Sequence, residues 1–416
     1  MTKSGRRVVV LGAGLTGAGT ALELARQGVD VVLIDQDNTP VNRASLRNEG
    51  KIHLGFIYAK DTSLNTAKLQ LEGALRFRSL LSRWIGDKAG QLGLSTPFVY
   101  LVARDSLSMP AQLAQHYDAV DAAYRQAMAE DKALDYLGLR PDHLYHSLDL
   151  AKLSSYVDPR HFSAAFHTEE RAIDTEQLAQ LLRAAIAESP RIRFLPKHKV
   201  KAVKRHDGHF SIEGDGSEGA WRLEAEQVVN ALWEGRLAVD QCVGLPNPPG
   251  WLHRMKYRVI ARVPDTLRHA PSITGVLGPY GDIVIRPDGT AYLSWYPIGM
   301  KGWSHDVAPP ADWDAPCRGE LPDSEAAQVA EETIDSLAKW YPPIRDVVPI
   351  LVDAGAIVAY GKTDVGDSNS ELHDRTRIGV FSSAGYHSID PGKLTTAPLF
   401  AKQAADRVLA EMIGQP

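Results

Sequence analysis

The segment from Val8 to Asp35 constrains the fold of this chain more than any other part of its sequence. It contains an apolar strand, a loop with Gly12, Gly14 and Gly17, a helix, a second apolar strand and a terminal aspartate. Gly12 permits a tight turn, Gly14 lets backbone amides approach a pyrophosphate, and Gly17 lets the helix pack close to the strand. This order of elements predicts a Rossmann-type dinucleotide site.

The helix start and the second strand end indicate where a dinucleotide would lie. The helix begins at Leu15 and Thr16, so its N-terminal amides and dipole favour a pyrophosphate there. Asp35 follows Gly17 by eighteen residues. It ends the second strand beside Gln36, where a carboxylate can accept hydrogen bonds from an adenosine ribose. The glycine pattern does not distinguish a nicotinamide from a flavin dinucleotide.

The length and composition limit the class of protein. With 416 residues, the chain exceeds the usual size of a single core, so we expect two or three domains. A net charge of -5 provides no basic field for nucleic acid. Cys242 and Cys317 are the only cysteines and belong to no metal-binding motif, so we expect no disulfide framework, no metal site and a cytoplasmic location. No stretch approaches the ~18 apolar residues of a transmembrane segment.

The pattern of apolar residues predicts the remaining elements. Helices are predicted over residues 63–84, 110–130, 175–188 and 398–412, with Thr175 as a cap. Strands are predicted over 97–104, 227–233 and 377–383, with a strand–turn–strand unit within 191–214 and three strand-like runs between 235 and 349.

These elements predict an α/β protein with two domains. A Rossmann-like nucleotide domain is expected from residues 1–85, 156–235 and 350–416. An inserted α+β domain, built on an antiparallel sheet, is expected from residues 86–155 and 236–349.

Two further segments have the composition of ligand-binding loops. The segment from Arg43 to Tyr58 places Ser45, Lys51 and His53 among glycines, although a solvated surface loop is the alternative. The segment from Ser382 to Leu399 follows a strand and can start a helix capped by Thr395 or Thr396. Such a helix N-terminus forms an anion or carbonyl-oxygen site; the alternative is an ordinary capped helix.

The opening fingerprint, SLRNEGKIHLGFIY with the following SLNTAKLQLEGA, the VVNA strand end and the terminal GKLTT resemble the D-amino-acid oxidase superfamily of FAD enzymes. This group includes glycine and sarcosine oxidases, glycerol-3-phosphate dehydrogenase and L-2-hydroxyglutarate dehydrogenase. The resemblance implies FAD rather than a nicotinamide, bound to a nucleotide domain of the glutathione-reductase type. It is spread over the nucleotide domain and is faint in the middle of the chain.

The resemblance also implies individual contacts to FAD. Gly12, Gly14 and Gly17 would meet the pyrophosphate, and Asp35 the adenosine ribose. A helix N-terminus at the pyrimidine end would stabilise the negative charge that a flavin gains on accepting a hydride. The other implied cofactor positions are Arg43, Ala44 and Ser45; Lys51, Ile52 and His53 beside the isoalloxazine ring; Val200 at adenine; Ala231; Gly385; and Gly392, Lys393, Leu394 and Thr395 at the pyrimidine end.

Two departures from the family narrow this expectation. The C-terminal loop has neither a Cys nor an obvious His in the arrangement by which some relatives hold flavin covalently, and His387 is the nearest candidate. We therefore expect noncovalent FAD. The GD element of the aromatic hydroxylase branch is missing, which argues against a monooxygenase.

The substrate is expected between the flavin and the antiparallel sheet. Arg258 and Arg286 are candidates for clamping a carboxylate through two hydrogen bonds, and Tyr296 and His387 are further catalytic candidates. The expected reaction is oxidation of a C–H bond next to an amino or hydroxyl group of a small carboxylate-bearing substrate, with hydride transfer to flavin. A hydroxy acid needs a base, for which His53 is the candidate, whereas a neutral amine needs none.

The electron acceptor is expected to be O2, a quinone or another carrier. Three alternatives stay open at this point: a nicotinamide dehydrogenase, a flavin monooxygenase that uses NAD(P)H, and a noncatalytic FAD-binding protein.

Overall fold

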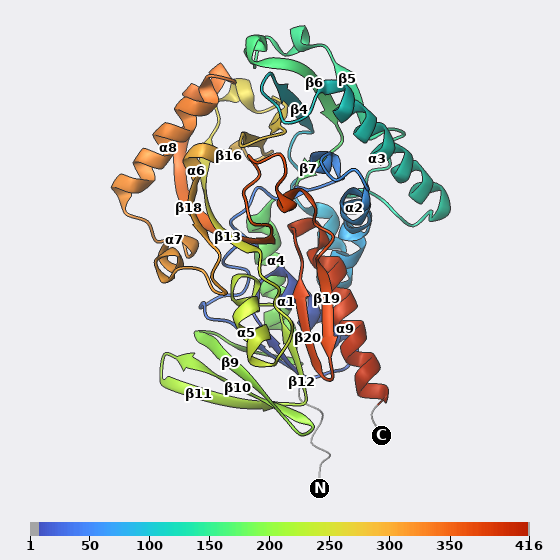
Figure 1. Ribbon diagram of the computed structural model, residues 1–416, viewed down its shortest axis with the longest axis vertical. Coiled ribbons are helices and arrows are strands. Elements are labelled where there is room, and N and C mark those ends of the chain that lie inside the picture. The colour runs from blue at the N-terminus through green and yellow to red at the C-terminus, as the bar shows by residue number, and fades with distance from the viewer. Residues whose placement is uncertain (1–7, 415–416) are drawn as a thin grey trace.

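The computed structural model describes residues 8–414. Its nucleotide end is a six-stranded sheet in which five strands run parallel to one another and the edge strand β19 is antiparallel to β20 (Figure 1). β1 lies inside this sheet, and all four of its residues are buried, as expected for a parallel strand covered on both faces. In spatial order the strands are β19 (Gly379–Ser383), β20 (Tyr386–Asp390), β12 (Gln227–Asn230), β1 (Val8–Leu11), β2 (Val31–Ile34) and β8 (Ile192–Leu195).

Different layers cover the two faces of this sheet. Val8 and Val10 pack into a cluster with four helices, whereas Val9 and Leu11 point the opposite way into a second cluster. The helices are α1 (Leu15–Arg26), α2 (Asn65–Ile85), α4 (Thr175–Glu188) and α9 (Ala397–Gly414). The opposite layer is a three-stranded sheet of β9 (His198–His206), β10 (His209–Gly216) and β11 (Gly219–Ala225), with helix α5 (Arg236–Cys242).

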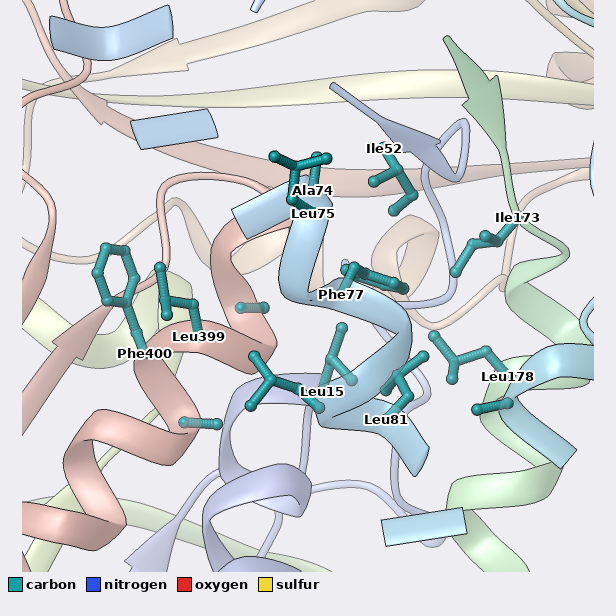
Figure 2. Packing of buried hydrophobic residues seen from close by; sticks show 14 of the residues in the cluster. Leu15, Ile52, Ala74, Leu75, Phe77, Leu81, Ile173, Leu178, Leu399 and Phe400 are labelled. Atoms are coloured by element: carbon teal, nitrogen blue, oxygen red, sulfur yellow. The ribbon is translucent and has the colours of Figure 1, made fainter. Parts of the chain in front are cut away.

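Helix α2 forms the centre of the helical layer. Figure 2 shows Phe77 and Leu81 of α2 beside Leu15 of α1, with Leu178 of α4 on one side and Leu399 of α9 on the other. Phe77 and Leu81 have no exposed area. Burying a side chain of this size stabilises the fold by about 1.5–3 kcal/mol. Through these buried contacts, α2 holds together α1, α4 and α9, which are distant in sequence.

A nine-stranded sheet forms the other half of the molecule. Its strands are antiparallel except for the parallel pair β4 and β14. In spatial order they are β17 (Met300–Ser304), β13 (Trp251–Arg262), β16 (Thr290–Trp295), β15 (Gly281–Ile285), β14 (Ser272–Val276), β4 (Phe98–Ala103), β6 (Phe162–Thr168) and β5 (Tyr145–Leu148), with β18 (Val348–Tyr360) paired to β13.

Strand β4 shows how this sheet joins two cores. Tyr100 and Val102 face the cluster that contains α2 and α3 (Pro110–Glu130), whereas Val99 and Leu101 face the cluster that contains α8 (Asp323–Ala338). This alternation is the period of two that a strand with two covered faces requires. The short elements β3 (Lys51–Ile52), β7 (Arg171–Ala172), α6 (Tyr296–Gly299) and α7 (Asp314–Cys317) complete the fold.

The α/β fold class and the four predicted long helices are confirmed. The structure has α2, α3, α4 and α9 where residues 63–84, 110–130, 175–188 and 398–412 were predicted. The predicted cap of α4 is wrong by one residue, because the Asp174 side chain accepts hydrogen bonds from the amides of Glu176 and Gln177 at 2.9 and 3.0 Å. Thr175 instead donates to the carbonyl of Leu46.

Two predictions for strands need correction. The segment after Ser383 was expected to be a loop, but β20 follows it and pairs with both β19 and β12. Ala384 and Gly385, with φ of 40° and 84°, form the tight hairpin turn that a positive φ at both positions permits. The strand-like run predicted over residues 290–297 ends at Trp295, since α6 begins at Tyr296.

The predicted domain boundaries also differ from the sheets. Strand β6 lies within residues 156–235 and most of β18 within 350–416, both assigned to the nucleotide domain, yet these strands pair with β4, β5 and β13 in the larger sheet. Residues 1–7 and 415–416 of that predicted domain lie outside the described residues. The pairing favours boundaries on the C-terminal sides of β6 and β18.

Gly17→Ala tests the approach of α1 to β1. A Cβ on Gly17 would lie 1.8 Å from the carbonyl oxygen of Gly12, and the loop would have to move because both groups belong to the backbone. We expect a loss of about 1–3 kcal/mol in unfolding free energy and weakened FAD binding, measured by urea unfolding and flavin fluorescence. Gly90→Ala is the control, because its Cβ would meet only Arg78 at 3.8 Å. Wild-type stability and FAD affinity in Gly17→Ala would contradict this account.

Candidate functional site

A cavity of about 1340 Å³, counted out to its open mouth, lies at the carboxyl ends of β1, β2 and β12. Ligands of open α/β sheets bind at this edge. We refer to this cavity as the nucleotide cavity.

The glycine loop leaves its backbone uncovered in the wall of this cavity. Gly12 has a φ of 89°, and a Cβ there would lie 2.6 Å from the carbonyl oxygen of Ala231. A Cβ on Gly14 would lie 3.1 Å from Ser45 Oγ, and that hydroxyl accepts a hydrogen bond from the amide of Leu15 at 2.9 Å. The loop therefore has the shape of a cradle for a pyrophosphate, with the N-terminus of α1 beneath it.

Asp35 is held at the end of β2. Its carboxylate accepts hydrogen bonds from the amides of Ala13 and Asp37 at 2.6 and 2.9 Å, and burial raises its pKa above the ordinary value. Arg43 forms ion pairs with Asp37 and Asp314 at 2.9 and 2.8 Å. The acid and the arginine thus fix two walls of the cavity in place.

Most of the predicted cofactor positions line the nucleotide cavity. They come from the glycine loop, the end of β2, the segment after it, the end of β12 and the segment before α9. These residues are Gly12, Gly14, Leu15, Thr16, Asp35, Gln36, Arg43, Ala44, Ser45, Lys51, His53, Ala231, Gly392, Lys393 and Leu394.

The other predicted cofactor positions lie elsewhere. Gly17, Ile52 and Thr395 are behind the wall, where Thr395 accepts a hydrogen bond from the amide of His53 at 2.9 Å. Val200 lies on β9 in the cluster under the sheet, and Gly385 lies at the amino end of β20, the edge opposite the cavity. The position of Gly385 does not support a cofactor contact. The contact of Val200 with adenine stays a prediction, because β9 begins beside the end of β2, where the amide of His198 donates to the carbonyl of Asp35 at 2.8 Å.

His387 is also remote from the cavity. Its ring lies fully buried on β20, 2.9 Å from Ser382 Oγ and 3.1 Å from Gln227 Oε1. The predicted catalytic role of His387 is therefore not supported, because both ring nitrogens bind side chains of the sheet.

A second cavity of about 930 Å³ adjoins the nucleotide cavity. Besides the residues that it shares with the nucleotide cavity, the second cavity is lined by residues of β13, β14 and β15 and of the segment between β18 and β19. We call it the inner cavity. The residues that line both cavities are Glu49, Lys51, Lys256, Ile357 and Lys393.

Two cations of the inner cavity have acidic partners. Lys51 Nζ lies 2.8 Å from Asp282 Oδ1, and Arg254 donates to Asp364 at 2.8 Å and to the hydroxyl of Tyr296 at 2.7 Å. Attraction to Lys51 and Lys256 holds the pKa of Asp282 well below its ordinary value although burial opposes it. Tyr296, a predicted site residue, therefore belongs to the wall of the inner cavity.

Three other cations of the inner cavity, Lys256, Arg375 and Lys393, form no ion pair in the part of the chain that the structure describes. Within residues 8–414, no group forms a hydrogen bond or ion pair with the guanidinium of Arg375 or the ammonium of Lys393. Arg375 is only 6% exposed. Burial lowers the pKa of Lys393 to about 8; Glu49 opposes this effect, and nearby Arg375, Arg254 and Lys256 act in the same direction as burial.

His53 is coupled to a buried carboxylate. Its Nδ1 lies 3.3 Å from Glu170 Oε1, and Glu170 also accepts hydrogen bonds from the amide of Leu54 at 2.7 Å and from the hydroxyl of Tyr100. Burial lowers the pKa of His53, and Glu170 opposes that effect. Both ring nitrogens of His53 are covered, so the ring forms part of the wall without presenting a nitrogen to the cavity.

The two arginines predicted to clamp a carboxylate are poorly placed for it. Arg258 lines the nucleotide cavity, but its Nε donates to Asp353 Oδ1 at 2.6 Å and its Nη1 donates to the carbonyl of Leu46 at 2.9 Å. Arg286 is buried and lines neither cavity. The structure instead brings Arg254 and Arg375 to the inner cavity.

Several site residues were not anticipated. Arg254 and Lys256 precede Arg258 at intervals of two on β13, so the period of a strand places the three side chains on one face of the sheet. This spacing could have been used to predict Arg254 and Lys256 as site residues together with Arg258. Tyr58 ends the segment that was predicted to bind a ligand, although its own role was not predicted. Arg375 offered no signal, because its segment reaches the inner cavity only through long-range packing.

Comparisons with known proteins agree with the geometry. A family model described as FAD dependent oxidoreductase (DAO) matches residues 7–407, so the chain belongs to this family of oxidoreductases and its cofactor is FAD. A tRNA 5-methylaminomethyl-2-thiouridine biosynthesis bifunctional protein from Marinobacter nauticus is 39% identical over 82 residues, 19% of this chain. That match spans 12% of the relative's own length.

Solved structures share the whole fold at low sequence identity. Glycine oxidase from Geobacillus kaustophilus is similar with a TM-score of 0.67 and 16% identity, covering 97% of this chain and 95% of that one. FAD-bound L-alpha-glycerophosphate oxidase from Mycoplasma pneumoniae has a TM-score of 0.63 and 16% identity, covering 98% and 95%. None of the helices within residues 8–414 has the length and apolar character needed to span a bilayer.

Glu170→Gln tests the coupling to His53. The substitution removes the charge that raises the pKa of His53 against the effect of burial. We therefore expect the titration of His53, followed by its NMR ring resonances, to move to lower pH. Glu169→Gln is the matched control, because Glu169 pairs with Arg171 at 3.6 Å instead. A His53 titration that stays in place or moves upward in Glu170→Gln would contradict the coupling.

Proposed function

We propose that this protein oxidises a C–H bond next to an amino or hydroxyl group of a small, carboxylate-bearing substrate. The observation that carries the proposal is the unpaired guanidinium of Arg375 in a cavity that shares a wall with the nucleotide cavity. A carboxylate there would meet a desolvated Arg, and the adjoining carbon would lie toward the shared wall. Holding both reactants in one orientation accelerates such reactions strongly.

The residues of the nucleotide cavity fit FAD. Gly12 and Gly14 would hold the pyrophosphate, Asp35 the ribose, and the segment from Gly392 to Leu394 the pyrimidine end of the flavin. Bound FAD supplies a two-electron acceptor for hydride. The N-terminus of α9 lies behind this segment, so its dipole favours negative charge there. The absence of a side chain on Gly12 and Gly14, both in the lining of the cavity, supports this assignment.

The carboxylate of the substrate would bind at the inner end of the inner cavity. Arg375 can donate two parallel hydrogen bonds to a carboxylate, and the buried hydroxyl of Tyr58, which has no hydrogen-bond partner within residues 8–414, is a third donor. Arg254 adds positive charge from β13. After oxidation, O2 or a quinone would accept the electrons.

Anaerobic bleaching of the flavin tests this function. We expect the purified protein to be yellow and its flavin absorbance to disappear when a suitable amino or hydroxy carboxylate is added without air. NAD(P)H alone should not bleach it. Bleaching by NAD(P)H, or no bleaching by a broad panel of such carboxylates, would contradict the proposal.

Arg375→Gln provides the companion test. Since Arg375 would hold the carboxylate, the substrate concentration for half-maximal bleaching should rise at least ~10-fold, the range for a lost charged hydrogen bond. Unfolding should become less favourable, because an unpaired buried charge is removed. Arg377→Gln is the control, as Arg377 is exposed two residues away. An unchanged concentration dependence in Arg375→Gln would exclude this role for Arg375.

A further inference from the structure

Building on the oxidoreductase function proposed above, we propose that the substrate is an anionic 2-hydroxy acid rather than an amino acid, and that Lys393 Nζ accepts its hydroxyl proton. Both parts concern the inner cavity and its shared wall. The structural neighbours include a glycine oxidase, named for an amino acid, and a glycerophosphate oxidase, named for a hydroxyl-bearing anion, so the fold does not decide between an amino and a hydroxyl substrate.

The charge of the inner cavity favours the hydroxy acid. Asp282 offsets Lys51, and Asp364 offsets Arg254. The other acid that lines this cavity, Glu49, is shared by Lys256 and Lys393, and Arg375 forms no ion pair within residues 8–414, so positive charge is in excess. A 2-hydroxy acid brings one negative charge and a neutral hydroxyl. An amino acid brings the same carboxylate together with an ammonium, and like charges at close range disfavour each other in a desolvated site.

Glu49 is the acid that an ammonium would need, and cations already surround it. Its carboxylate lines both cavities. Burial would raise its pKa, but Lys256 and Lys393 hold the pKa below its ordinary value. The Nε2 atom of His53 lies 3.9 Å from Glu49 Oε1. Glu49 therefore balances the lysines of the shared wall and leaves no free negative charge for an amine.

Lys393 is placed to receive a proton. Its side chain lines both cavities at the junction where the reacting carbon would lie, and its ammonium has no hydrogen-bond partner within residues 8–414. A pKa of about 8 lies in the range that suits a general base at neutral pH. Several titratable and charged groups face it or line the same cavities. They are Glu49, Lys51 and His53 from the segment around β3, Arg254 and Lys256 from β13, and Arg375 from the segment before β19.

The reaction balances with these groups alone and the bound cofactor. The O–H bond breaks as its proton moves to neutral Lys393 Nζ, which becomes an ammonium. The oxygen and carbon form a C=O bond, and the Cα–H hydrogen leaves with its electron pair as hydride to FAD. The substrate is oxidised by two electrons, FAD is reduced by two, and the product is a 2-oxo acid.

Binding of two unreactive analogues tests the substrate class without turnover. 2-Hydroxyisobutyrate and 2-aminoisobutyrate lack a Cα–H bond and differ only in the hydroxyl or amino group. In titrations of the holoenzyme followed by flavin absorbance at pH 7, we expect the hydroxy acid to bind at least 10-fold more tightly. Arg375→Gln should weaken its binding at least 10-fold, and Arg377→Gln should not. Equal or tighter binding of the amino acid, or binding of neither analogue, would overturn the proposed class.

The role of Lys393 is tested by Lys393→Arg and Lys393→Met. The wild-type rate of flavin reduction by a reactive 2-hydroxy acid should rise as the pH increases through about 8, because the neutral amine is the base. Lys393→Arg keeps a positive charge but cannot accept a proton at this pH. We expect both variants to lose this pH dependence and ~10²–10⁴ of the rate while FAD stays bound. Lys301→Arg, on the exposed part of β17, is the control.

The outcomes separate this inference from the proposed function. A rate in Lys393→Arg that keeps the wild-type pH dependence would overturn the base role, since a structural cation would be replaced by Arg. Faster flavin reduction by alanine or glutamate than by lactate or 2-hydroxyglutarate would overturn the substrate class while leaving the oxidation of carboxylates intact. Preferential binding of 2-hydroxyisobutyrate with no bleaching by any substrate would instead refute the proposed function and support the anion site.

Discussion

The close approach of helix α1 to its neighbours is the constraint on which the cofactor end of the molecule depends. On one side, Gly17 lies so near Gly12 that no Cβ fits between them, and on the other, Gly19 lies against the ring of Trp84. A buried ion pair secures this second contact, because Glu23 of α1 accepts hydrogen bonds from Arg83 and from Trp84 Nε1 at 3.1 Å. The position of α1 thus fixes the glycine loop, and through α2 it fixes the layer that carries α9.

The parts of the fold that could be predicted are those encoded by local sequence. The glycine loop and the long helices follow from spacing within a single segment, where a period of 3.6 or a fixed glycine position suffices. β6 and β18 were misassigned because the sheet to which a strand belongs is decided by partners far along the chain. β20 was missed for another reason, since the turn at Ala384 and Gly385 also resembles the end of a strand.

The site follows the same division between local and long-range information. Some site residues, Lys51, His53 and Lys393, belong to local motifs that can be recognised in the sequence. The roles of Arg375 and Glu170 depend on residues from distant parts of the chain that pack beside them. Arg258 shows why residue type is not enough. It faces Asp353 across β13 and β18, so a cross-strand ion pair occupies the side chain that looked most suitable for a substrate.

The unpaired guanidinium of Arg375 connects stability to function. Removing an ion from water costs several kcal/mol even after relaxation, and within residues 8–414 Arg375 forms no ion pair, although the charge of Asp390 attracts it. Favourable interactions elsewhere in the fold must offset this desolvation free energy, and a bound anion would offset part of it. Binding to the folded state alone also stabilises that state in proportion to ligand occupancy. The same charge that weakens the empty protein therefore provides the affinity of the occupied one, and it does so beside the wall where Lys393 and the nucleotide cavity meet.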